Sequence, residues 1–523
     1  MYKKIKLLLS TIKHLKSSQI LWQIIYRLKK KQFILDKDLS YQTNYITFCY
    51  YIKQEGKFRG NQTFRFLNLE NKFEQKIDWS YEKNGKLWNY NLEYFDYLHQ
   101  EDVSVEEKIN LIFDFYNFSI SNQKKMEPYP ISLRLINCIK FLSLHQVSDP
   151  KINNYLYQEA DYLSQNLEYH ILGNHLLENG FALLIASAYF KNDSWVNKAE
   201  NLLVKELEEQ ILGDGSHFEL SPMYHQIIFF RVLELIDWYS KWNKKKNKFL
   251  EYLKVIASRM NSFLENISFK NGDIPHFNDS SDGIAYSTSE LRKYFSSLQL
   301  QSSPVGLKDS GYRSMSNAFL EVKIDVAQLA VDYQPGHAHA DSLGYIIYYK
   351  EKPFIVEQGT STYQINQRRA LERSSAAHNT VVLNNENHSQ VWSGFRVGSR
   401  ASTEILDDTK SFIKARHDGY LHKYKLWHER SFEMKSQTFE IIDVLSKNVE
   451  AESHIHFANG VVPIVNENNI TFAHLPVLIK VKEFQLIRIE EYQQADGYNK
   501  YLKNHKVIIS FTKKMKLIID FSS

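Results

Sequence analysis

The strongest constraint on the fold is a change in the spacing of apolar residues near residue 305. From about residue 100 to 300 apolar residues recur every three or four positions, as in "QIIFFRVLELIDWYSKW" and "FLEYLKVIASRMNSFL", which predicts amphipathic helices. After residues 302–315 the spacing falls to two, in short β-branched or aromatic runs such as "LGYIIYYK" and "NTVVLNN". We therefore expect a helical domain followed by an antiparallel sheet or sandwich.

The length of the chain sets the number of domains. Its 523 residues exceed the size at which a single hydrophobic core usually stops growing, so at least two domains are expected. We place a basic, mixed N-terminal extension at residues 1–84, an all-α domain at 85–305 and an antiparallel β domain at 306–523. Because no low-complexity linker separates the last two, we expect them to pack directly against each other.

Charge and cysteine content exclude several classes of protein. The net charge of +5, from 65 basic and 60 acidic residues, is too small for a dedicated nucleic-acid binder. A mild positive excess is nevertheless compatible with a polyanionic substrate, because a cleft can concentrate charge locally. Cys49 and Cys138 are the only cysteines, and neither a disulfide framework nor a cysteine-based zinc site is predicted.

The N-terminal stretch "MYKKIKLLLSTIKHLKSSQILWQIIYRLKKKQ" is basic and amphipathic. Its apolar runs are short and no small-residue cleavage site follows them, so no cleavable signal peptide is predicted. The chain contains no apolar run of 18 residues, so no membrane-spanning helix is expected. Two interpretations of this stretch remain, a helix with a solvated polar face and a helix that contacts a membrane surface.

Two motifs in the helical half carry candidate catalytic residues. In "GNHLLENG", Asn174, His175 and Glu178 share one side of a helix start, where Asn and His could hold a carboxylate and Glu could orient the imidazole. The alternative is a capping Asn174 beside a solvated His175. In "DGSHFELSPMYHQ", Tyr224 could act as a general base if nearby donors stabilise its phenolate, or it could simply pack.

Glu178 and three further residues are candidates for substrate binding. Arg134 in "PYPISLRLINC" could clamp an acid group or pair with a surface carboxylate. Trp88 and Tyr90 in "LWNYNLEYFDYL" could stack on sugars, although packing in a helical core is the alternative.

The β half contains a His-x-His pair in "GHAHADSLG". His337 and His339 would project side by side from an extended segment, because residues two apart on a strand face the same way. Glu357 and His378 follow at intervals of 18 and 21 residues, and two histidines with one carboxylate can bind zinc. These spacings match no standard metal motif, so a metal site, an acid–base pair and polar structure all remain open.

Four stretches together resemble the heparinase II/III-like polysaccharide lyases. They are "GNHLLENG", "DGSHFELSPMYHQ", "PGHAHADSLGYIIYYKEKPFIVEQGTSTY" and "RSSAAHNTVVLNNENHSQVW", and the similarity spans about residues 85–450. The resemblance implies an incomplete α/α toroid followed by an antiparallel β-sandwich. It also implies an acidic polysaccharide as substrate and a location in the cell envelope or periplasm, although the absence of a predicted signal peptide keeps the cytoplasm as the alternative.

The resemblance also implies a role for each matching residue. Asn174 and His175 match residues that neutralise the uronate carboxylate. Tyr224 matches the tyrosine that abstracts the C5 proton and reprotonates the leaving oxygen, and His337 matches a histidine that reaches into the cleft. The remaining matches form a structural zinc set, in which the family more often has Asp at the position of Glu357: His339, Glu357 and His378.

The function expected from these residues is β-elimination on a uronate-containing acidic polysaccharide such as a glycosaminoglycan or alginate. Removing a proton next to a carboxylate develops further negative charge, which donors aimed at that carboxylate would stabilise. Two alternatives remain. One is a uronyl C5-epimerase, which needs the same proton abstraction. The other is a non-catalytic glycan-handling protein of capsule or exopolysaccharide production.

Overall fold

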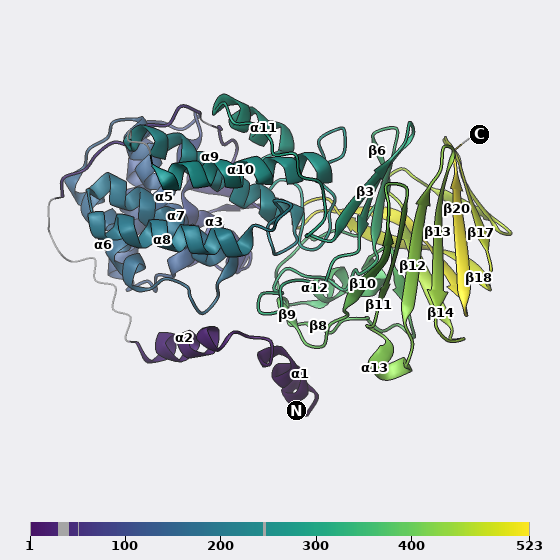
Figure 1. Ribbon diagram of the computed structural model, residues 1–523. Helices are drawn as coiled ribbons and strands as arrows, with labels where there is room; N and C mark the ends of the chain where they lie inside the picture. Colours follow the sequence, from purple (N-terminus) through teal and green to yellow (C-terminus); the bar gives the residue numbers. More distant parts are fainter. Residues whose placement is uncertain (1, 30–40, 51, 244–246, 522–523) are drawn as a thin grey trace.

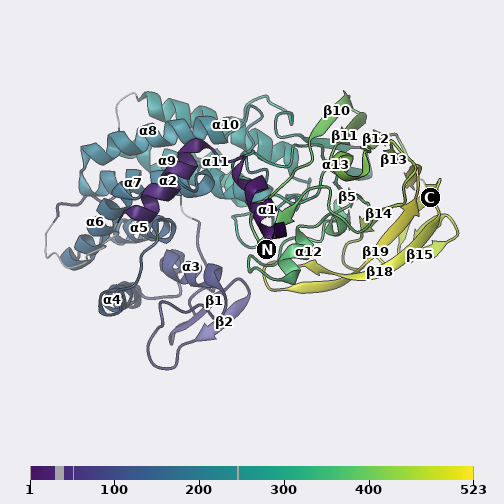
Figure 2. The ribbon, with the colours of Figure 1, turned by 90° about the horizontal axis from the view of Figure 1, so that it is seen from below.

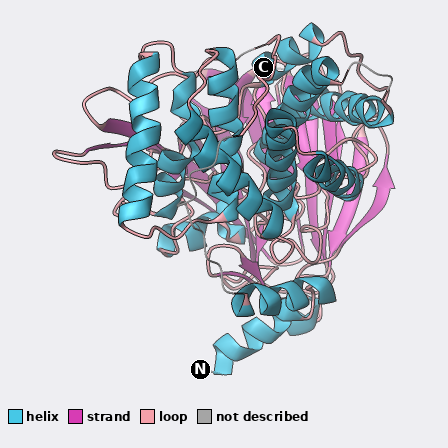
Figure 3. Cartoon of the chain, turned by 90° about the vertical axis from the view of Figure 1, so that its left-hand side faces the viewer, coloured by secondary structure: helices cyan, strands magenta, loops and turns pink. Residues whose placement is uncertain are grey.

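The computed structural model describes residues 2–29, 41–50, 52–243 and 247–521; the end of the basic N-terminal stretch, residues 30–32, lies outside them. The region from residue 86 to 297 is helical and lies on one side of the molecule (Figures 1 and 3). Its helices are α3 (Lys86–Tyr94), the 3₁₀ turn η1 (Asp96–His99), α4 (Val105–Ser121), α5 (Pro128–Leu144), α6 (Pro150–Gln165), α7 (Gly173–Phe190), α8 (Asp193–Gln210), α9 (Pro222–Trp242), α10 (Lys248–Ile267) and α11 (Thr288–Ser297).

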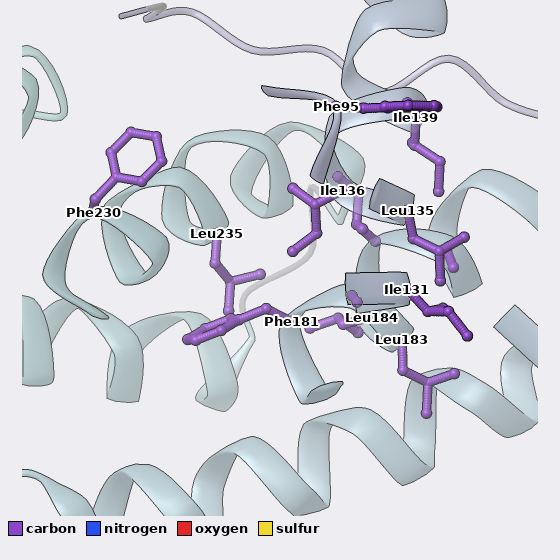
Figure 4. Packing of buried hydrophobic residues seen from close by; sticks show 14 of the residues in the cluster. Phe95, Ile131, Leu135, Ile136, Ile139, Phe181, Leu183, Leu184, Phe230 and Leu235 are labelled. Atoms are coloured by element: carbon purple, nitrogen blue, oxygen red, sulfur yellow. The ribbon is translucent and has the colours of Figure 1, made fainter. Parts of the chain in front are cut away.

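Polar caps and an apolar interior explain why these helices form. Ser104 caps α4 by accepting a hydrogen bond from the Glu107 backbone N–H at 3.1 Å. Helix α5 is buried along almost its whole length, and its apolar side chains pack against Phe181 and Leu184 of α7 (Figure 4). The helical half is therefore organised around the α5–α7 pair.

Antiparallel strands make up the C-terminal half. One sheet has the order β3 (Tyr312–Ser316), β4 (Leu320–Asp325), β5 (Tyr345–Tyr349), β6 (Lys352–Ile355). A second has the order β18 (Leu486–Ala495), β19 (Tyr501–Phe511), β14 (Ala451–His456), β7 (Val381–Val382). An eight-stranded sheet has the order β10 (Thr403–Asp408), β11 (Phe412–His417), β12 (His428–Met434), β13 (Thr438–Leu445), β20 (Lys514–Asp520), β17 (Leu475–Lys482), β16 (Asn469–Phe472), β15 (Pro463–Asn466).

The period of two in the sequence corresponds to alternating burial in this half. Along β11 and β20 every second side chain is buried, as expected for a sheet with one face in a core. Short elements connect the sheets: α12 (Gln367–Glu372), η2 (Ser375–Ala377), α13 (Leu421–Tyr424), β8 (Val391–Trp392) and β9 (Arg396–Val397). The predicted order, helices followed by antiparallel strands, is confirmed.

The two halves contact each other directly through a mixed apolar cluster. Phe263 and Phe269 of the helical half pack with Tyr312 and Tyr348 of the sheet half. The last helix ends at Ser297 and the first C-terminal strand begins at Tyr312. The loops that cross between the halves, residues 268–287 and 326–344, contribute the site described below.

The described part of the N-terminal extension contains a pair of helices and a β-hairpin. Helices α1 (Tyr2–Ile12) and α2 (Ser17–Leu28) lie along the outside of the molecule (Figure 1). Strands β1 (Thr63–Phe66) and β2 (Leu69–Lys72) form a hairpin beside α3 (Figure 2). Among the residues that the structure describes, no helix is both long and apolar enough to cross a bilayer.

Candidate active site

Two cavities of about 570 Å³ each meet at Tyr224. We call the one lined by Asn174, His175 and His337 the histidine cavity. The other, lined by Arg65 and Arg231, we call the arginine cavity. Both are bordered by the same group of mainly aromatic residues: Leu67, Leu87, Tyr94, Tyr129, Tyr224, Tyr363 and Tyr498. A sugar chain that occupied both cavities would pass Tyr224 at their junction.

Asn174 is fixed at the start of α7 by a buried carboxylate. Gly173 has φ of 59°, and a Cβ there would lie 2.5 Å from Glu219 Oε1, so glycine allows the close approach. The backbone N–H of Asn174 donates to Glu219 Oε1 at 3.2 Å, and its Nδ2 lies 3.1 and 3.0 Å from the two carboxylate oxygens. The amide is therefore preorganised, with Nδ2 retaining a second N–H.

His175 lies between an aromatic ring and a carboxylate at the wall of the histidine cavity. Its ring is 4.2 Å from that of Tyr129, and Nδ1 is 3.3 Å from Glu168 Oε1. Burial disfavours the imidazolium, but the charge and hydrogen bond of Glu168, with Glu219 and Glu178 nearby, raise the pKa of His175. The site therefore favours a cationic His175, which suits a carboxylate ligand.

Tyr224 lies in the first turn of α9. Ser221 caps this helix by accepting from the Tyr224 backbone N–H at 3.2 Å. The Tyr224 hydroxyl is 3.3 Å from that of Tyr363, and its ring centroid is 4.0 Å from that of His337. Burial raises the pKa of Tyr224 well above its ordinary value, with Tyr498 adding to the rise and the Tyr363 hydrogen bond opposing it. Tyr224 is therefore protonated in the ligand-free protein.

Asp279 is a residue of the site that the sequence analysis did not single out. One of its oxygens lies 2.9 Å from His337 Nδ1, and the other lies 2.8 Å from His339 Nε2. Arg369 binds the same carboxylate, with Nη2 2.6 Å from Oδ2. Although burial opposes its charge, Arg369 and the two histidines hold the pKa of Asp279 well below the ordinary value. The aspartate-rich turn "FNDSSDG" was the only sequence signal for this residue.

The two histidines of the His-x-His pair differ in exposure, but both contact Asp279. The His337 side chain is 12% exposed and lines the histidine cavity, whereas the His339 side chain is 1% exposed and lies behind it. Because Asp279 accepts from Nδ1 of His337, Nε2 of that ring is directed to the cavity side, 3.8 Å from Glu219 Oε2.

Two of the four residues suggested for substrate binding lie at the cavities. Tyr90 lines the histidine cavity, and its hydroxyl donates to Glu127 at 2.8 Å. Glu178 lines the arginine cavity and accepts from Arg231 Nε at 3.0 and 3.2 Å. Each already has a protein partner, so contact with a sugar would be made alongside that partner.

The other two suggestions are wrong, because both side chains are inaccessible. Arg134 is fully buried in α5, where its Nε donates to Glu159 at 2.9 Å and its guanidinium lies 4.3 Å from the Phe115 ring centroid. Trp88 is also fully buried, and its Nε1 donates to the Leu69 carbonyl at 3.0 Å. Trp88 packs in the helical core, as its alternative interpretation proposed. Arg134 pairs with a carboxylate, but that carboxylate is the buried Glu159 and not a surface residue.

The residues expected to bind zinc lie together but are not arranged as a three-ligand cluster. His339 and His378 have ring centroids 5.2 Å apart, and His339 Nδ1 and His378 Nε2 are buried without a hydrogen-bond partner. Glu357 is hydrogen-bonded to the other nitrogen of His378, Nδ1. Within the described ranges, no three His, Cys, Asp or Glu side chains are placed to hold a metal ion. Two nitrogen donors are thus free for a metal, and a third ligand would require Glu357 or another group to move.

Fold and sequence together identify the class of protein. The fold is that of solved polysaccharide lyases: a heparinase III crystal structure superposes with a TM-score of 0.70 at 15% identity, covering 97% of this chain and 90% of that one. A mutant heparan sulfate lyase from Pedobacter heparinus gives a TM-score of 0.60 at 17% identity, covering 88% and 81%. At these identities the likeness concerns the fold alone.

The chain belongs to the heparinase II/III-like family. Residues 131–301 match the heparinase II/III N-terminus and residues 301–519 match the heparinase II/III-like C-terminal domain. A heparin-sulfate lyase from Bacteroides stercoris is 23% identical over 323 residues, 55% of this chain and 46% of that protein. A heparin-sulfate lyase from Pedobacter heparinus is 23% identical over 332 residues, 58% and 49%. The chain thus spans about half the length of the curated relatives that it matches.

Proposed function

We propose that the protein is a polysaccharide lyase that cleaves a uronate-containing acidic polysaccharide by β-elimination. The observation that carries this proposal is the convergence of Asn174, His175, Tyr224 and His337 on one cavity. Membership of the heparinase II/III-like family and the similarity to heparin-sulfate lyases support the same activity. All four side chains that the chemistry needs are present, which favours a catalytic over a purely glycan-binding protein.

The first step of this chemistry is neutralisation of the uronate carboxylate. A cationic His175 and the second N–H of Asn174 can bind it in the histidine cavity. These contacts strengthen as the C5 proton leaves and charge moves onto the carboxylate, so they stabilise the transition state more than the bound substrate.

The second step is proton transfer at the junction of the two cavities. Tyr224 enters the reaction with its proton, because burial raises its pKa. It can therefore protonate the leaving 4-linked oxygen directly. To act as the base at C5 it must first give up that proton, and the neighbouring base is the imidazole of His337, whose ring centroid lies 4.0 Å from that of Tyr224. The Tyr363 hydroxyl is itself protonated, because burial raises its pKa, so it can share a hydrogen bond with Tyr224 but cannot take its proton. The product would be a 4,5-unsaturated uronate.

The test is to incubate the protein with heparan sulfate, chondroitin sulfate and alginate and to follow ultraviolet absorbance from the conjugated uronate. The same reactions run in deuterated water separate the epimerase alternative, which would place deuterium at C5 of a product that remains saturated. A lyase gives absorbance and shorter chains. Deuterium incorporation at C5 without absorbance and without shorter chains would show that the protein is an epimerase and not a lyase.

We also propose a structural zinc ion bound by His339 and His378, with Glu357 as the third ligand after release from His378. The support is that the two unpartnered nitrogens belong to buried imidazoles whose ring centroids lie 5.2 Å apart, so that one ion could contact both. When bound, zinc would tie the 336–344 loop to the segment before β7. The proposed proton transfers do not pass through this ion.

Two finer features of the architecture and location complete the proposal. The helices would form an incomplete α/α toroid and the C-terminal sheets a sandwich, as the family resemblance implies. The protein would work in the cell envelope or periplasm, where acidic polymers are accessible.

The α1–α2 arm would hold the protein at a membrane surface. Residues 1–35 contain nine Lys or Arg residues and no Asp or Glu. One side of the arm docks on the protein: Thr11 donates to the Val397 carbonyl at 3.0 Å, and Trp22 stacks on Tyr169 at 4.9 Å. The other side leaves large aliphatic residues exposed by 38–78%: Ile5, Leu8, Leu9, Ile12, Ile20, Leu21, Ile24 and Leu28. A basic helix pair with exposed aliphatic residues suits an anionic lipid surface.

A further inference from the structure

The β1–β2 hairpin builds one wall of the arginine cavity and lies outside the residues, 131–519, that match the family. Its position is fixed from within the helical half. The buried Phe66 ring packs edge-on against Trp88 at 5.2 Å, and Trp88 donates to the Leu69 carbonyl (Figure 2 shows the hairpin beside α3). Because Phe64 and Phe66 face inward, strand alternation turns Arg65 outward, to the cavity side.

The tip of the hairpin is also tied to the sheet half. Leu67 and Asn68 have φ of 53° and 60°, the left-handed pair of a tight two-residue hairpin turn. Asn68 Nδ2 donates to the Tyr498 carbonyl at 3.0 Å, and Asn499 Nδ2 donates to the Leu67 carbonyl at 3.0 Å. The hairpin thus spans from one half of the molecule to the other beside Tyr224, and Arg65 is held on a wall anchored at both ends.

Arg65 differs from the other cations of the arginine cavity in its partners. Four of the five lining cations are each paired with a carboxylate: Lys57 with Asp96, Arg59 with Glu70, Lys140 with Glu234, and Arg231 with Glu178 and Glu234. Arg65 is exposed and has no acidic partner among the residues that the structure describes. Glu55 also lines this cavity, and within the described part of the chain it forms no ion pair, so the cavity has one unpaired group of each sign.

We propose that Arg65 binds an anionic group, a carboxylate or a sulfate, on the sugar that lies across Tyr224 from the uronate held by Asn174 and His175. The inference rests on the proposed function, because an acidic polysaccharide carries such groups on both sides of the cleaved bond. The planar guanidinium can give two parallel hydrogen bonds to either group. The anchored hairpin reduces the entropy lost when this contact forms.

The test measures binding of size-defined heparan sulfate oligosaccharides, and of their desulfated, re-acetylated forms, to the Tyr224→Phe protein by calorimetry. We expect Arg65→Gln to raise Kd by about tenfold or more, as loss of a charge-assisted hydrogen bond implies. The Kd of Arg65→Lys should lie between those of Arg65→Gln and the unchanged Arg65, since lysine keeps the positive charge but lacks the planar guanidinium that gives two parallel hydrogen bonds. The matched control is Lys72→Gln on the same hairpin, which removes an exposed cation 3.3 Å from Glu74 and away from both cavities.

The outcomes separate this inference from the proposed function. A loss of affinity by Arg65→Gln for the sulfated forms alone identifies a sulfate, and an equal loss for both forms identifies a carboxylate. If Arg65→Gln binds both forms as tightly as Lys72→Gln does, Arg65 has no such role, whether or not the protein cleaves them. If wild-type protein binds without forming unsaturated product, the lyase proposal fails and the same comparison still decides Arg65. If it binds neither form, nor chondroitin sulfate or alginate oligosaccharides, both are overturned.

Discussion

Asp279 fixes the orientation of both histidines of the His-x-His pair by contacting one ring nitrogen of each. It holds Nδ1 of His337 and Nε2 of His339, so the two rings share one aspartate. The sequence pattern drew attention to both histidines, but Asp279 lies about 60 residues earlier, in the loop before α11. Nothing in the local pattern of "FNDSSDG" distinguishes a buried carboxylate from a turn residue, because its partners come from the other half of the fold.

Replacing Asp279 by Asn should destabilise the protein strongly. Arg369 would be left buried without a counter-charge, which costs roughly 3–5 kcal/mol and is measurable by denaturant unfolding. The folded pKa of Asp279 lies below its unfolded value, so its contribution is complete near neutral pH and is lost as the pH falls through the folded pKa. Asp282→Asn is the control, because that carboxylate is mostly exposed and should cost less than about 1 kcal/mol. Equal effects of the two variants would contradict this view of Asp279.

The zinc proposal predicts a specific pattern of metal loss. Elemental analysis of the purified protein should find about one zinc per chain, and a chelator should lower Tm because metal binding stabilises the folded state. His339→Ala and His378→Ala should lose the metal, whereas His337→Ala should retain it, since that ring faces the cavity. The proposal would be contradicted if the purified protein contained no zinc and its Tm changed with neither added zinc nor added chelator.

At the scale of elements, the spacing of apolar residues predicted where helices and strands form better than it predicted which of their side chains are buried. Helix α9 and strand β5 form where "QIIFFRVLELIDWYSKW" and "LGYIIYYK" indicated. The β1–β2 hairpin was not foreseen, because two four-residue strands give too short a pattern. The misassigned Trp88 shows the same limit: the helical pattern of α3 does not reveal that the hairpin covers this ring.

The α1–α2 arm should bind anionic vesicles. We expect the protein to sediment with vesicles containing phosphatidylglycerol but not with pure phosphatidylcholine, and salt should weaken this binding by screening the charges. Replacing Leu9, Leu21 and Leu28 by Gln should abolish sedimentation without changing Tm, because these residues are 63%, 57% and 78% exposed. Vesicle binding that persists in this triple variant would rule out the aliphatic face as the contact.

At the scale of the whole molecule, the change of period near residue 305 predicted the two-part architecture, and the family resemblance predicted which residues would converge. The convergence itself depends on contacts between the halves: His337 comes from the sheet half, Tyr224 and His175 from the helical half. Sequence spacing carries no information on such contacts. That is why Asp279, Tyr363 and the hairpin were found only in the structure, while Asn174, Tyr224 and His337 could be named beforehand.

The most direct test of the central claim compares wild-type protein with Tyr224→Phe in the ultraviolet assay on an acidic polysaccharide that the wild type cleaves. Removing only the Tyr224 hydroxyl should lower kcat by about 10²-fold or more, with Tm nearly unchanged because the ring packing is kept. Asn174 and His175 remain in place, so substrate affinity should change little. Formation of unsaturated product by Tyr224→Phe at the wild-type rate would contradict the account.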